Sequence, residues 1–389
     1  MKISLLSNGV FPYVTGGIQK HTLLLAKHLA RLNVKIDLIY TCTPVTRVNG
    51  EINTYLTKEE LKNICTIRVK PYRSQYFPSH YLWSSFRSSK AIYDVLTQRE
   101  FSDFIYAQGF TGWETIRKKL SGRPLPPIGV NFHGLEMYQK AASIIPKFEQ
   151  LMFRPFVKWN LKNANYALSL GGNLTSIIKK VAGKNTHVLE SANGIDSDWI
   201  NDNINIYPLN NKLVRFVFVG RYERRKGIQE LTAVINDLGD NPWSQFDFVG
   251  PIPEYLKLKQ KNVRYHGLVK EQDKIQSILY RSDILVCPSY SEGLPTVILE
   301  GMACANAIIA TDVGAIDSIV SKANGWLIKP GNSEQLKDAI LNAKRISTTE
   351  LNEKKIHSRE LVERSFTWER VAENTITNIA SAIERKNFV

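Results

Sequence analysis

The sequence predicts an α/β protein made of two doubly wound, Rossmann-like halves. Three observations lead to this prediction. Short apolar runs alternate with longer amphipathic stretches, a polar stretch interrupts the alternation near the middle of the chain, and the alternation then restarts. Such alternation is typical of parallel sheets with helices on both faces. The length of 389 residues suits two domains of ordinary size.

The first half, residues 1–196, contains five predicted strands. Stretches with helical apolar spacing, such as residues 18–32, separate several of them. The strands are KISLL (2–6), VKIDLIY (34–40), DFIYAQ (103–108), IGVNF (128–132) and YALSL (166–170).

The polar stretch GIDSDWINDNINIYPLNNK at 194–212 is rich in Asn and Asp and has little periodic apolar pattern. We predict an interdomain linker there, at 197–212. The second domain, 213–366, follows with six predicted strands: LVRFVFVG (213–220), QFDFVG (245–250), NVRYHG (262–267), DILVCP (283–288), AIIAT (307–311) and GWLIKP (325–330).

Two helical segments close the chain, at roughly 347–363 and 367–386. We expect the last helix, within 367–389, to pack back on the first domain. Ligands of such sheets bind outside the carboxyl ends of the strands, so we expect an interdomain cleft that holds the ligand.

The composition fits a globular protein, with 43% hydrophobic and 22% charged residues. The formal net charge of +15 favours polyanionic partners, which include nucleic acid, an anionic membrane surface and phosphate-bearing substrates. No run of 18 apolar residues suggests a transmembrane helix. The four cysteines form no CxxC pair, which predicts a cytoplasmic protein without a metal site.

The most informative stretch is SEGLPTVILEGMA at 291–303. It follows a buried strand and predicts a helix that begins near Pro295 with Leu294 at the N-cap. Leu294 offers no side-chain acceptor, so the amides of Thr296 and Val297 are free for a phosphate, which the helix dipole also favours.

The same helix separates two carboxylates, Glu292 and Glu300, by at most ~12 Å. This distance lets Glu292 reach the sugar and Glu300 the ribose of one nucleotide sugar. The alternative is that Glu292 lies in a solvated turn and Glu300 on a solvent-exposed helix face. On this stretch alone, the two interpretations have even weight.

The loop GRYERRKG at 220–227 supplies cations that a bound diphosphate would need. Gly220 permits a tight exit from the preceding strand, and Arg221 and Lys226 can point at the phosphates. A solvated basic loop is the alternative.

Taken in order, these segments strongly resemble the large retaining glycosyltransferase family with the GT-B fold. The resemblance rests on GRYERRKGIQEL, VRYHGLV, RSDILVCPSYSEGLPTVILEGMACANAIIATDVGAIDSIV, NGWLIKPGNSEQL, FTWERVA and ANGID (192–196). The family's mark is two glutamates separated by seven residues, here Glu292 and Glu300. One departure is CANAIIAT, where Asn306 and Ala307 replace the usual glycine and proline.

The resemblance implies a role for each matching residue of the second half. Arg221 and Lys226 would hold the donor diphosphate, Glu292 would contact the transferred sugar, and Glu300 would bind the ribose. The turn that binds phosphate through its backbone amides would comprise Gly293, Leu294, Pro295, Thr296 and Val297.

In the first half, VTGGIQKHTLLLAKHL at 14–29 resembles the family's glycine loop, in which Gly17 would line the cleft opposite the donor. A plain strand–helix turn is the alternative. His133, just past a predicted strand, would lie beside the donor sugar, although an isolated histidine is usually structural. Glu136 and Gly16 are candidates for acceptor binding.

Two basic stretches with interleaved aromatic residues, 66–90 and 137–163, suit contact with an anionic membrane surface. An ordinary helix with a solvated basic side explains them equally well. Membrane contact would make the protein peripheral on the inner face of the plasma membrane and would suit a lipid-linked acceptor.

The predicted function is transfer of a hexosyl unit from a nucleoside diphosphate sugar to a hydroxyl of a glycan or lipid-linked acceptor. The resemblance implies retention of configuration, no metal or other cofactor, and bacterial polysaccharide, lipopolysaccharide or capsule synthesis. Loss of Arg221 or Lys226 would cost on the order of 2–4 kcal/mol in the barrier.

Other classes fit less well. A nucleotide-sugar epimerase of the same fold is the alternative enzyme, and the paired glutamates disfavour it. Nucleic acid is not expected as a partner because the sequence contains no recognisable nucleic-acid-binding motif. A nicotinamide dehydrogenase lacks its GxGxxG fingerprint. A non-catalytic sugar-binding relative is disfavoured by the intact set of phosphate-binding residues.

Overall fold

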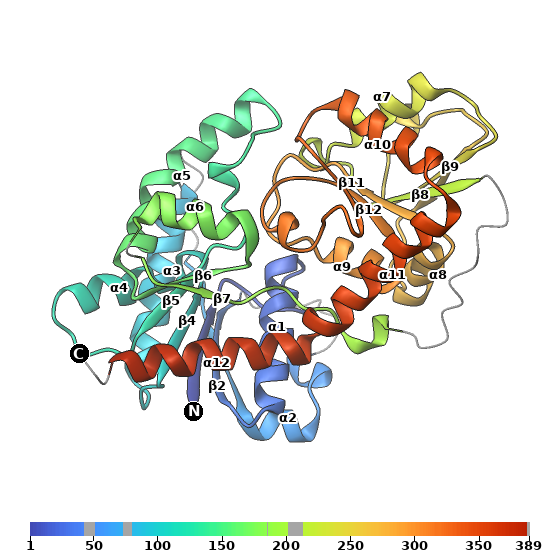
Figure 1. Cartoon of the computed structure of the whole chain (residues 1–389). Coiled ribbons are helices and arrows are strands. Elements are labelled where there is room, and N and C mark those ends of the chain that lie inside the picture. The colour runs from blue at the N-terminus through green and yellow to red at the C-terminus, as the bar shows by residue number, and fades with distance from the viewer. Residues whose placement is uncertain (43–50, 73–79, 185, 201–212, 387–389) are drawn as a thin grey trace. The chain divides into compact units, whose positions relative to one another are not determined.

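The computed structural model describes residues 1–42, 51–72, 80–184, 186–200 and 213–386. The chain divides into two compact units. Unit 1 comprises Met1–His133, Met152–Asn193 and Trp368–Val389, and unit 2 comprises Gly134–Leu151 and Gly194–Thr367. Residues 201–212 of the predicted linker lie outside the described residues. Figure 1 shows the ribbon of each unit, with helices packed on both faces of a sheet.

Unit 1 is built on a seven-stranded parallel sheet in the order β3-β2-β1-β4-β5-β6-β7. The strands are β1 (Lys2–Ser7), β2 (Lys35–Thr41), β3 (Ile64–Val69), β4 (Phe104–Gln108), β5 (Ile128–Asn131), β6 (Tyr166–Ser169) and β7 (Val188–Glu190). The five strands predicted for the first half are confirmed. The edge strands β3 and β7 were not predicted.

Among the described residues, six α-helices lie within unit 1, and a seventh, α5, begins in residues assigned to unit 2. They are α1 (Gly17–Arg31), α2 (Lys58–Asn63), α3 (His80–Leu96), α4 (Trp113–Leu120), α5 (Ile144–Asn163), α6 (Gly172–Ala182) and α12 (Trp368–Lys386). The C-terminal helix α12 crosses unit 1 and packs against α1, although more than 300 residues separate the two in the chain.

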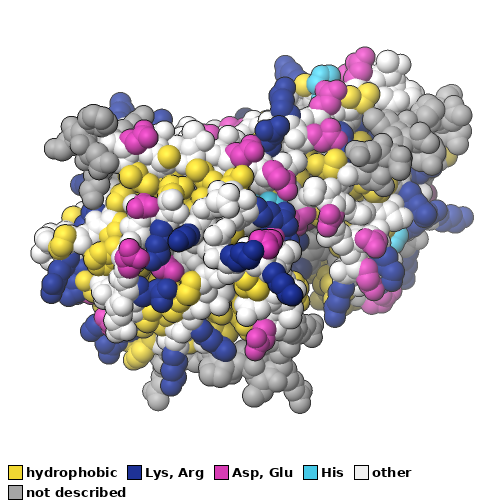
Figure 2. All heavy atoms as spheres, turned by 90° about the horizontal axis from the view of Figure 1, so that it is seen from below, with side chains coloured by type: hydrophobic (Ala, Val, Ile, Leu, Met, Phe, Trp, Pro, Cys, Tyr) yellow, Lys and Arg dark blue, Asp and Glu magenta, His cyan; other side chains and the backbone are white. Residues whose placement is uncertain are grey.

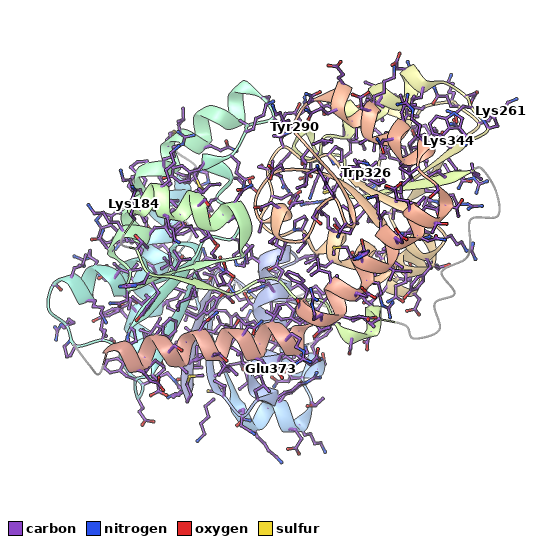
Figure 3. All side chains as sticks on the ribbon, viewed as in Figure 1. Lys184, Lys261, Tyr290, Trp326, Lys344 and Glu373 are labelled. Carbon is purple, nitrogen blue, oxygen red and sulfur yellow. The ribbon has the colours of Figure 1, made fainter. Side chains whose placement is uncertain are left out.

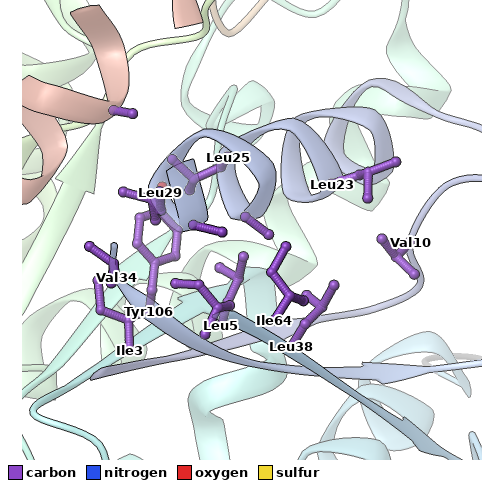
Figure 4. Close-up of a cluster of buried hydrophobic side chains, with 14 of the residues drawn as sticks. Ile3, Leu5, Val10, Leu23, Leu25, Leu29, Val34, Leu38, Ile64 and Tyr106 are labelled. Carbon is purple, nitrogen blue, oxygen red and sulfur yellow. The ribbon is translucent and has the colours of Figure 1, made fainter. Parts of the chain in front are cut away.

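The core of unit 1 explains why α1 forms where it does. The apolar residues of α1 recur at helical spacing, so that Leu25 and Leu29 fall on one face and are fully buried. They pack on Ile3 and Leu5 of β1 (Figure 4). Ile379 of α12 belongs to the same cluster. Burial of each such side chain contributes about 1.5–3 kcal/mol.

Unit 2 holds a six-stranded parallel sheet in the order β10-β9-β8-β11-β12-β13, which confirms all six predicted strands. The strands are β8 (Val214–Val219), β9 (Ser244–Val249), β10 (Val263–Gly267), β11 (Ile284–Cys287), β12 (Ala307–Thr311) and β13 (Gly325–Ile328). The helices are α7 (Ile228–Leu238), α8 (Gln272–Tyr280), α9 (Thr296–Ala303), α10 (Ser333–Arg345) and α11 (Thr348–Ser365).

Both sheets reverse their strand order at one point, between β1 and β4 in unit 1 and between β8 and β11 in unit 2. At such a point the loops after the two strands diverge to opposite faces and leave a crevice at the carboxyl ends, where α/β proteins bind ligands. The loops that follow β8 and β11 are those that contain residues 220–227 and 288–295. The topology of unit 2 therefore brings the two predicted donor-binding segments side by side.

Candidate active site

The loop after β11 is held in place by the loops that follow its neighbouring strands. The amide of Tyr290 donates to the carbonyl of Arg225 (2.8 Å), and the amide of Ala315 donates to the carbonyl of Gly293 (2.8 Å). Gly314 has a left-handed φ of 63°, and a Cβ at that position would overlap the carbonyl oxygens of Glu292 and Gly293. Close backbone approach on both sides therefore holds Glu292 in position.

Glu292 is only 7% exposed, and both of its carboxylate oxygens face cations. Lys226 Nζ lies 2.6 Å from Oε1, and Arg225 Nη1 lies 3.2 Å from Oε2. Burial pushes the pKa of Glu292 upward, but the charges of Lys226 and Arg225 outweigh it and hold the pKa below its ordinary value. Glu292 is therefore an anion held between two cations, not the solvated turn residue of the alternative reading.

Arg225, which was not predicted, contacts more of this loop than Arg221 does. Besides Glu292, Arg225 donates to the carbonyl of Ser291 (2.9 Å). Arg221 instead pairs with Glu223 at 3.0 Å, and its side chain is 75% exposed. The only sequence signal for Arg225 was its place in a run of cations, which does not tell which one turns toward the β11 loop.

The short helix Arg224–Lys226 is anchored by a second ion pair. Arg224 donates to both carboxylate oxygens of Glu230 at 2.9 and 2.6 Å, and the hydroxyl of Tyr290 donates to Glu230 at 2.8 Å. The guanidinium also lies over the Tyr290 ring, 4.7 Å from its centroid. Figure 3 labels Tyr290, which joins the β11 loop to this helix. These contacts fix the backbone from which Arg225 and Lys226 project.

The start of α9 differs by one residue from the prediction. The helix begins at Thr296, and Pro295 rather than Leu294 is the N-cap, because ψ of Pro295 is 121° and thus extended. Leu294 is buried in the turn. The side chain of Pro295 makes no capping hydrogen bond, because a proline has no acceptor with which to do so. The helix N-terminus is therefore suited to an anion, and Glu300 lies one turn further along, half-buried.

Glu136 and its neighbours also belong to unit 2. Glu136 lies 3.7 Å from Arg225 Nη1, and Gln139 Nε2 donates to the carbonyl of Glu292 at 2.6 Å. Burial raises the pKa of Glu136; Arg225 opposes this effect and Glu292 adds to it. The structure thus brings Glu136, proposed for the acceptor, to the same cluster as Glu292.

His133, Gly16 and Gly17 lie in unit 1. His133 follows β5 with a left-handed φ of 54°, and its ring Nε2 is 2.6 Å from the side-chain oxygen of Gln108. Burial, and then the neighbouring His21, hold the pKa of His133 well below its ordinary value. Gly16 precedes α1 as its N-cap, and a Cβ on Gly17 would meet no atom within 4 Å.

Two general properties of the described residues bear on ligands. They contain no group of three or more His, Cys, Asp or Glu side chains arranged to hold a metal ion. Over the same residues, no helix combines the length and apolar character needed to cross a membrane. Figure 2 shows one face of the molecule, on which basic side chains are spread among acidic and hydrophobic ones.

Comparison with known proteins finds similarity to glycosyltransferases. Residues 214–344 match the family described as glycosyl transferases group 1. The chain is similar to the putative teichuronic acid biosynthesis glycosyltransferase TuaC of Bacillus subtilis (strain 168), with 30% identity over 263 residues. That match covers 65% of this chain and 64% of TuaC, which is less than two thirds of the relative's length.

A second relative matches over nearly the full length. An uncharacterized glycosyltransferase of Methanocaldococcus jannaschii is 27% identical over 376 residues, which are 92% of this chain and 93% of that protein. Among solved structures, sucrose-phosphate synthase from Thermosynechococcus elongatus has a TM-score of 0.75 at 20% identity and covers 100% of this chain and 99% of its own. The likeness confirms the predicted GT-B fold class, and the names are those of transferase enzymes.

Proposed function

We propose that this protein is a glycosyltransferase that moves a hexosyl unit from a nucleoside diphosphate sugar to a hydroxyl of a glycan or lipid-linked acceptor. The observation that carries the proposal is the buried Glu292 between Lys226 and Arg225, beside the uncapped start of α9. The family match at 214–344 covers all of these residues. The epimerase alternative finds no support in the comparisons.

In this proposal the leaving group is a nucleoside diphosphate, whose negative charge grows as the glycosidic bond breaks. Lys226 and the amides at the start of α9 stabilise that charge, and such preorganised groups contribute most where water is excluded. Glu292 accepts hydrogen bonds from sugar hydroxyls, and Glu300 accepts them from the ribose. The leaving phosphate takes the proton of the incoming hydroxyl, with retention of configuration and without a metal.

A thermal-shift panel of nucleoside diphosphates and their sugars tests donor binding first. A nucleotide at a hundredfold excess over its Kd contributes about 2.7 kcal/mol to stability, so the correct one is expected to raise Tm by several degrees. The same protein with Glu300→Gln should respond less, because the ribose loses a charged acceptor. The proposal would be contradicted if all nucleotides raised Tm equally, or if no nucleotide raised it.

Transfer itself is measured with the nucleotide sugar chosen by the panel and a set of glycan and lipid-linked acceptors. Release of nucleoside diphosphate that depends on the acceptor and persists in EDTA supports a metal-independent transferase. The anomeric configuration of the product, observed by NMR, tests retention. We place the acceptor in bacterial polysaccharide, lipopolysaccharide or capsule synthesis, and the similarity to TuaC supports that choice.

We further propose that unit 1 contacts an anionic membrane surface through α3 and α5. Residues 73–79 of the predicted stretch 66–90 lie outside the described residues. On α3, the rings of Tyr81 and Trp83 are about half exposed, and Arg87 lies 5.2 Å from the Trp83 ring centroid. Tyr81 also contacts Phe153 of α5, next to the exposed Met152. We call Tyr81, Trp83, Arg87 and Met152 the α3–α5 surface.

Aromatic rings beside a cation are suited to the headgroup region, where apolar area and positive charge both contribute to binding. We expect the protein to sediment with vesicles of phosphatidylcholine and phosphatidylglycerol, but not with phosphatidylcholine alone. Trp83→Ala and Arg87→Ala are each expected to weaken this binding severalfold.

Tyr255→Ala is the matched control for the membrane experiment, because Tyr255 is 86% exposed but lies on unit 2. It should leave vesicle binding unchanged. Binding that does not distinguish anionic from neutral vesicles, or that is equally weakened by Tyr255→Ala, would show that the α3–α5 surface is not the contact.

A further inference from the structure

The backbone and the ring of His133 are held by side chains from two neighbouring strands of unit 1. Gln108 ends β4 and Asn131 ends β5, and the two residues are paired in register. Their side chains therefore lie on the same face of the sheet. The Asn131 side-chain oxygen accepts from the amide of His133 at 2.7 Å, and the Gln108 side-chain oxygen lies 2.6 Å from Nε2 of the ring.

The Gln108 contact selects one form of the imidazole. A neutral histidine carries one N–H and one lone pair on its two ring nitrogens, whereas a carboxamide oxygen can only accept. The structure places the Gln108 oxygen against Nε2 and leaves the Gln108 amide nitrogen without a hydrogen-bond partner among the described residues. In that orientation the proton is on Nε2 and Nδ1 is left as an acceptor. The low pKa of His133, due first to burial and then to His21, keeps the ring neutral at ordinary pH.

A buried hydrogen-bond chain determines how Asn131 is oriented. Its Nδ2 donates to the hydroxyl of Tyr106 (2.9 Å), which donates to Ser191 (3.3 Å), and Ser191 lies 3.1 Å from the hydroxyl of Thr375 on α12. Because Nδ2 is used in this chain, the Asn131 oxygen faces His133. The left-handed turn at His133 is thus tied to the sheet and to the C-terminal helix.

The other side of the His133 ring is also packed. His21 of α1 meets it edge-on, with ring centroids 4.9 Å apart and an interplanar angle of 87°. His21 in turn lies against Trp368 at the start of α12, with centroids 5.3 Å apart. A ring enclosed in this way cannot rotate freely, so the partner of Nε2 decides what Nδ1 can do.

We propose that Gln108 is a positioning residue that keeps His133 in its neutral, Nε2-protonated form, so that Nδ1 accepts a hydrogen bond from a sugar hydroxyl. Gln108, whose oxygen faces Nε2 of the ring, and His133 both belong to unit 1. The contact with sugar rests on the proposed function and on the place beside the donor sugar that the family resemblance implies for His133, and it is tested separately.

Nitrogen-15 NMR of the histidine rings tests the protonation directly, with His133→Asn to assign the signal. In the unaltered protein we expect a protonated Nε2 and an unprotonated Nδ1 at pH 7. Gln108→Leu removes the acceptor and should shift the population toward Nδ1–H. Gln108→Glu keeps an acceptor but adds a negative charge, which should retain Nε2–H and raise the pKa of His133.

Ser4→Ala is the matched control for Gln108→Leu. Ser4 lies on β1 of the same sheet, is buried, and its hydroxyl has no hydrogen-bond partner among the described residues. It should leave the His133 signal unchanged. An Nδ1–H form in the unaltered protein, or no change in Gln108→Leu, would overturn the assignment of Gln108. If Gln108→Leu fails to fold, Gln108→Glu tests the assignment of Gln108 instead. A His133 pKa that is unshifted in Gln108→Glu would also overturn that assignment.

Measurements of kcat test the proposed contact between His133 and the sugar. Loss of the outer hydrogen-bond partner of a metal-bound histidine typically costs 10- to 100-fold in activity, and by analogy we expect Gln108→Leu to lower kcat by about that factor. In Gln108→Glu, kcat should fall as the pH drops through the raised pKa of His133, because the charged ring has no acceptor. A changed ring protonation with unchanged kcat would retain the tautomer assignment but refute the contact with sugar.

Discussion

Lys226→Ala is expected to lower kcat by about 10²–10³-fold, which is the loss seen when one preorganised donor to a developing anion is removed. Lys226 Nζ is 2.6 Å from Glu292 in the free protein, and it is the cation we assign to the leaving diphosphate. One substitution therefore removes charge stabilisation from the transition state and half of the charge compensation of a buried carboxylate.

The variant also changes the pH dependence in a defined direction. Burial pushes the pKa of Glu292 up, and Lys226 is the first of the two cations that bring it down. Without Lys226 the pKa rises, so Glu292 is protonated at a higher pH than before. The acid limb of the kcat profile should move upward accordingly, whereas Lys226→Arg should keep it near its original position.

Lys261→Ala is the control for Lys226→Ala, because Lys261 is an exposed lysine of unit 2 that Figure 3 shows away from Tyr290. Turnover of Lys226→Ala close to that of Lys261→Ala would refute the assigned role. The same assay on Arg221→Ala and Arg225→Ala compares the residue implied by the resemblance with the one that contacts Glu292. Equal and large losses would show that both act on the donor.

Gly227→Ala is expected to lower the free energy of unfolding of unit 2 by about 2–4 kcal/mol. Gly227 has a left-handed φ of 69°, and a Cβ there would overlap the carbonyl oxygen of Pro288. The turn at Gly227 brings the Arg224–Lys226 helix against the end of β11, so the backbone must shift to admit the methyl group. Tm by calorimetry should fall by about 4–16 °C for a domain of this size.

Gly267→Ala separates backbone strain from the overlap at Gly227. Gly267 also has a left-handed φ, 68°, but a Cβ there would meet no atom within 4 Å. It should cost about 1–2 kcal/mol from strain alone. If the Gly227→Ala variant folds, its kcat should also fall, because Lys226 and Arg225 move away from Glu292. Equal Tm losses in both variants, with unchanged turnover, would contradict this explanation.

Local pattern was enough for the strands at the centre of both sheets. A strand buried on both faces of a sheet is a short run of apolar residues. Ile284–Cys287 and Ala307–Thr311 are such runs, and each forms a buried strand. The edge strand β3, ICTIRV, has two exposed and two half-buried residues among its six, and β7 has only three residues. Neither gives a periodic signal strong enough to detect.

The spacing of Glu292 and Glu300 and the uncapped start of α9 were likewise visible in the residues, because both depend on neighbours within one turn and one helix. The cation that faces Glu292 was not. Arg225 and Glu292 are 67 residues apart, and their contact depends on how two loops pack at the ends of β8 and β11. The same holds for Gln108 and His133, which meet because β4 and β5 are neighbours in register. Periodicity and spacing report on the chain near each residue, whereas the direction of a loop side chain is decided by contacts between segments that only folding brings together.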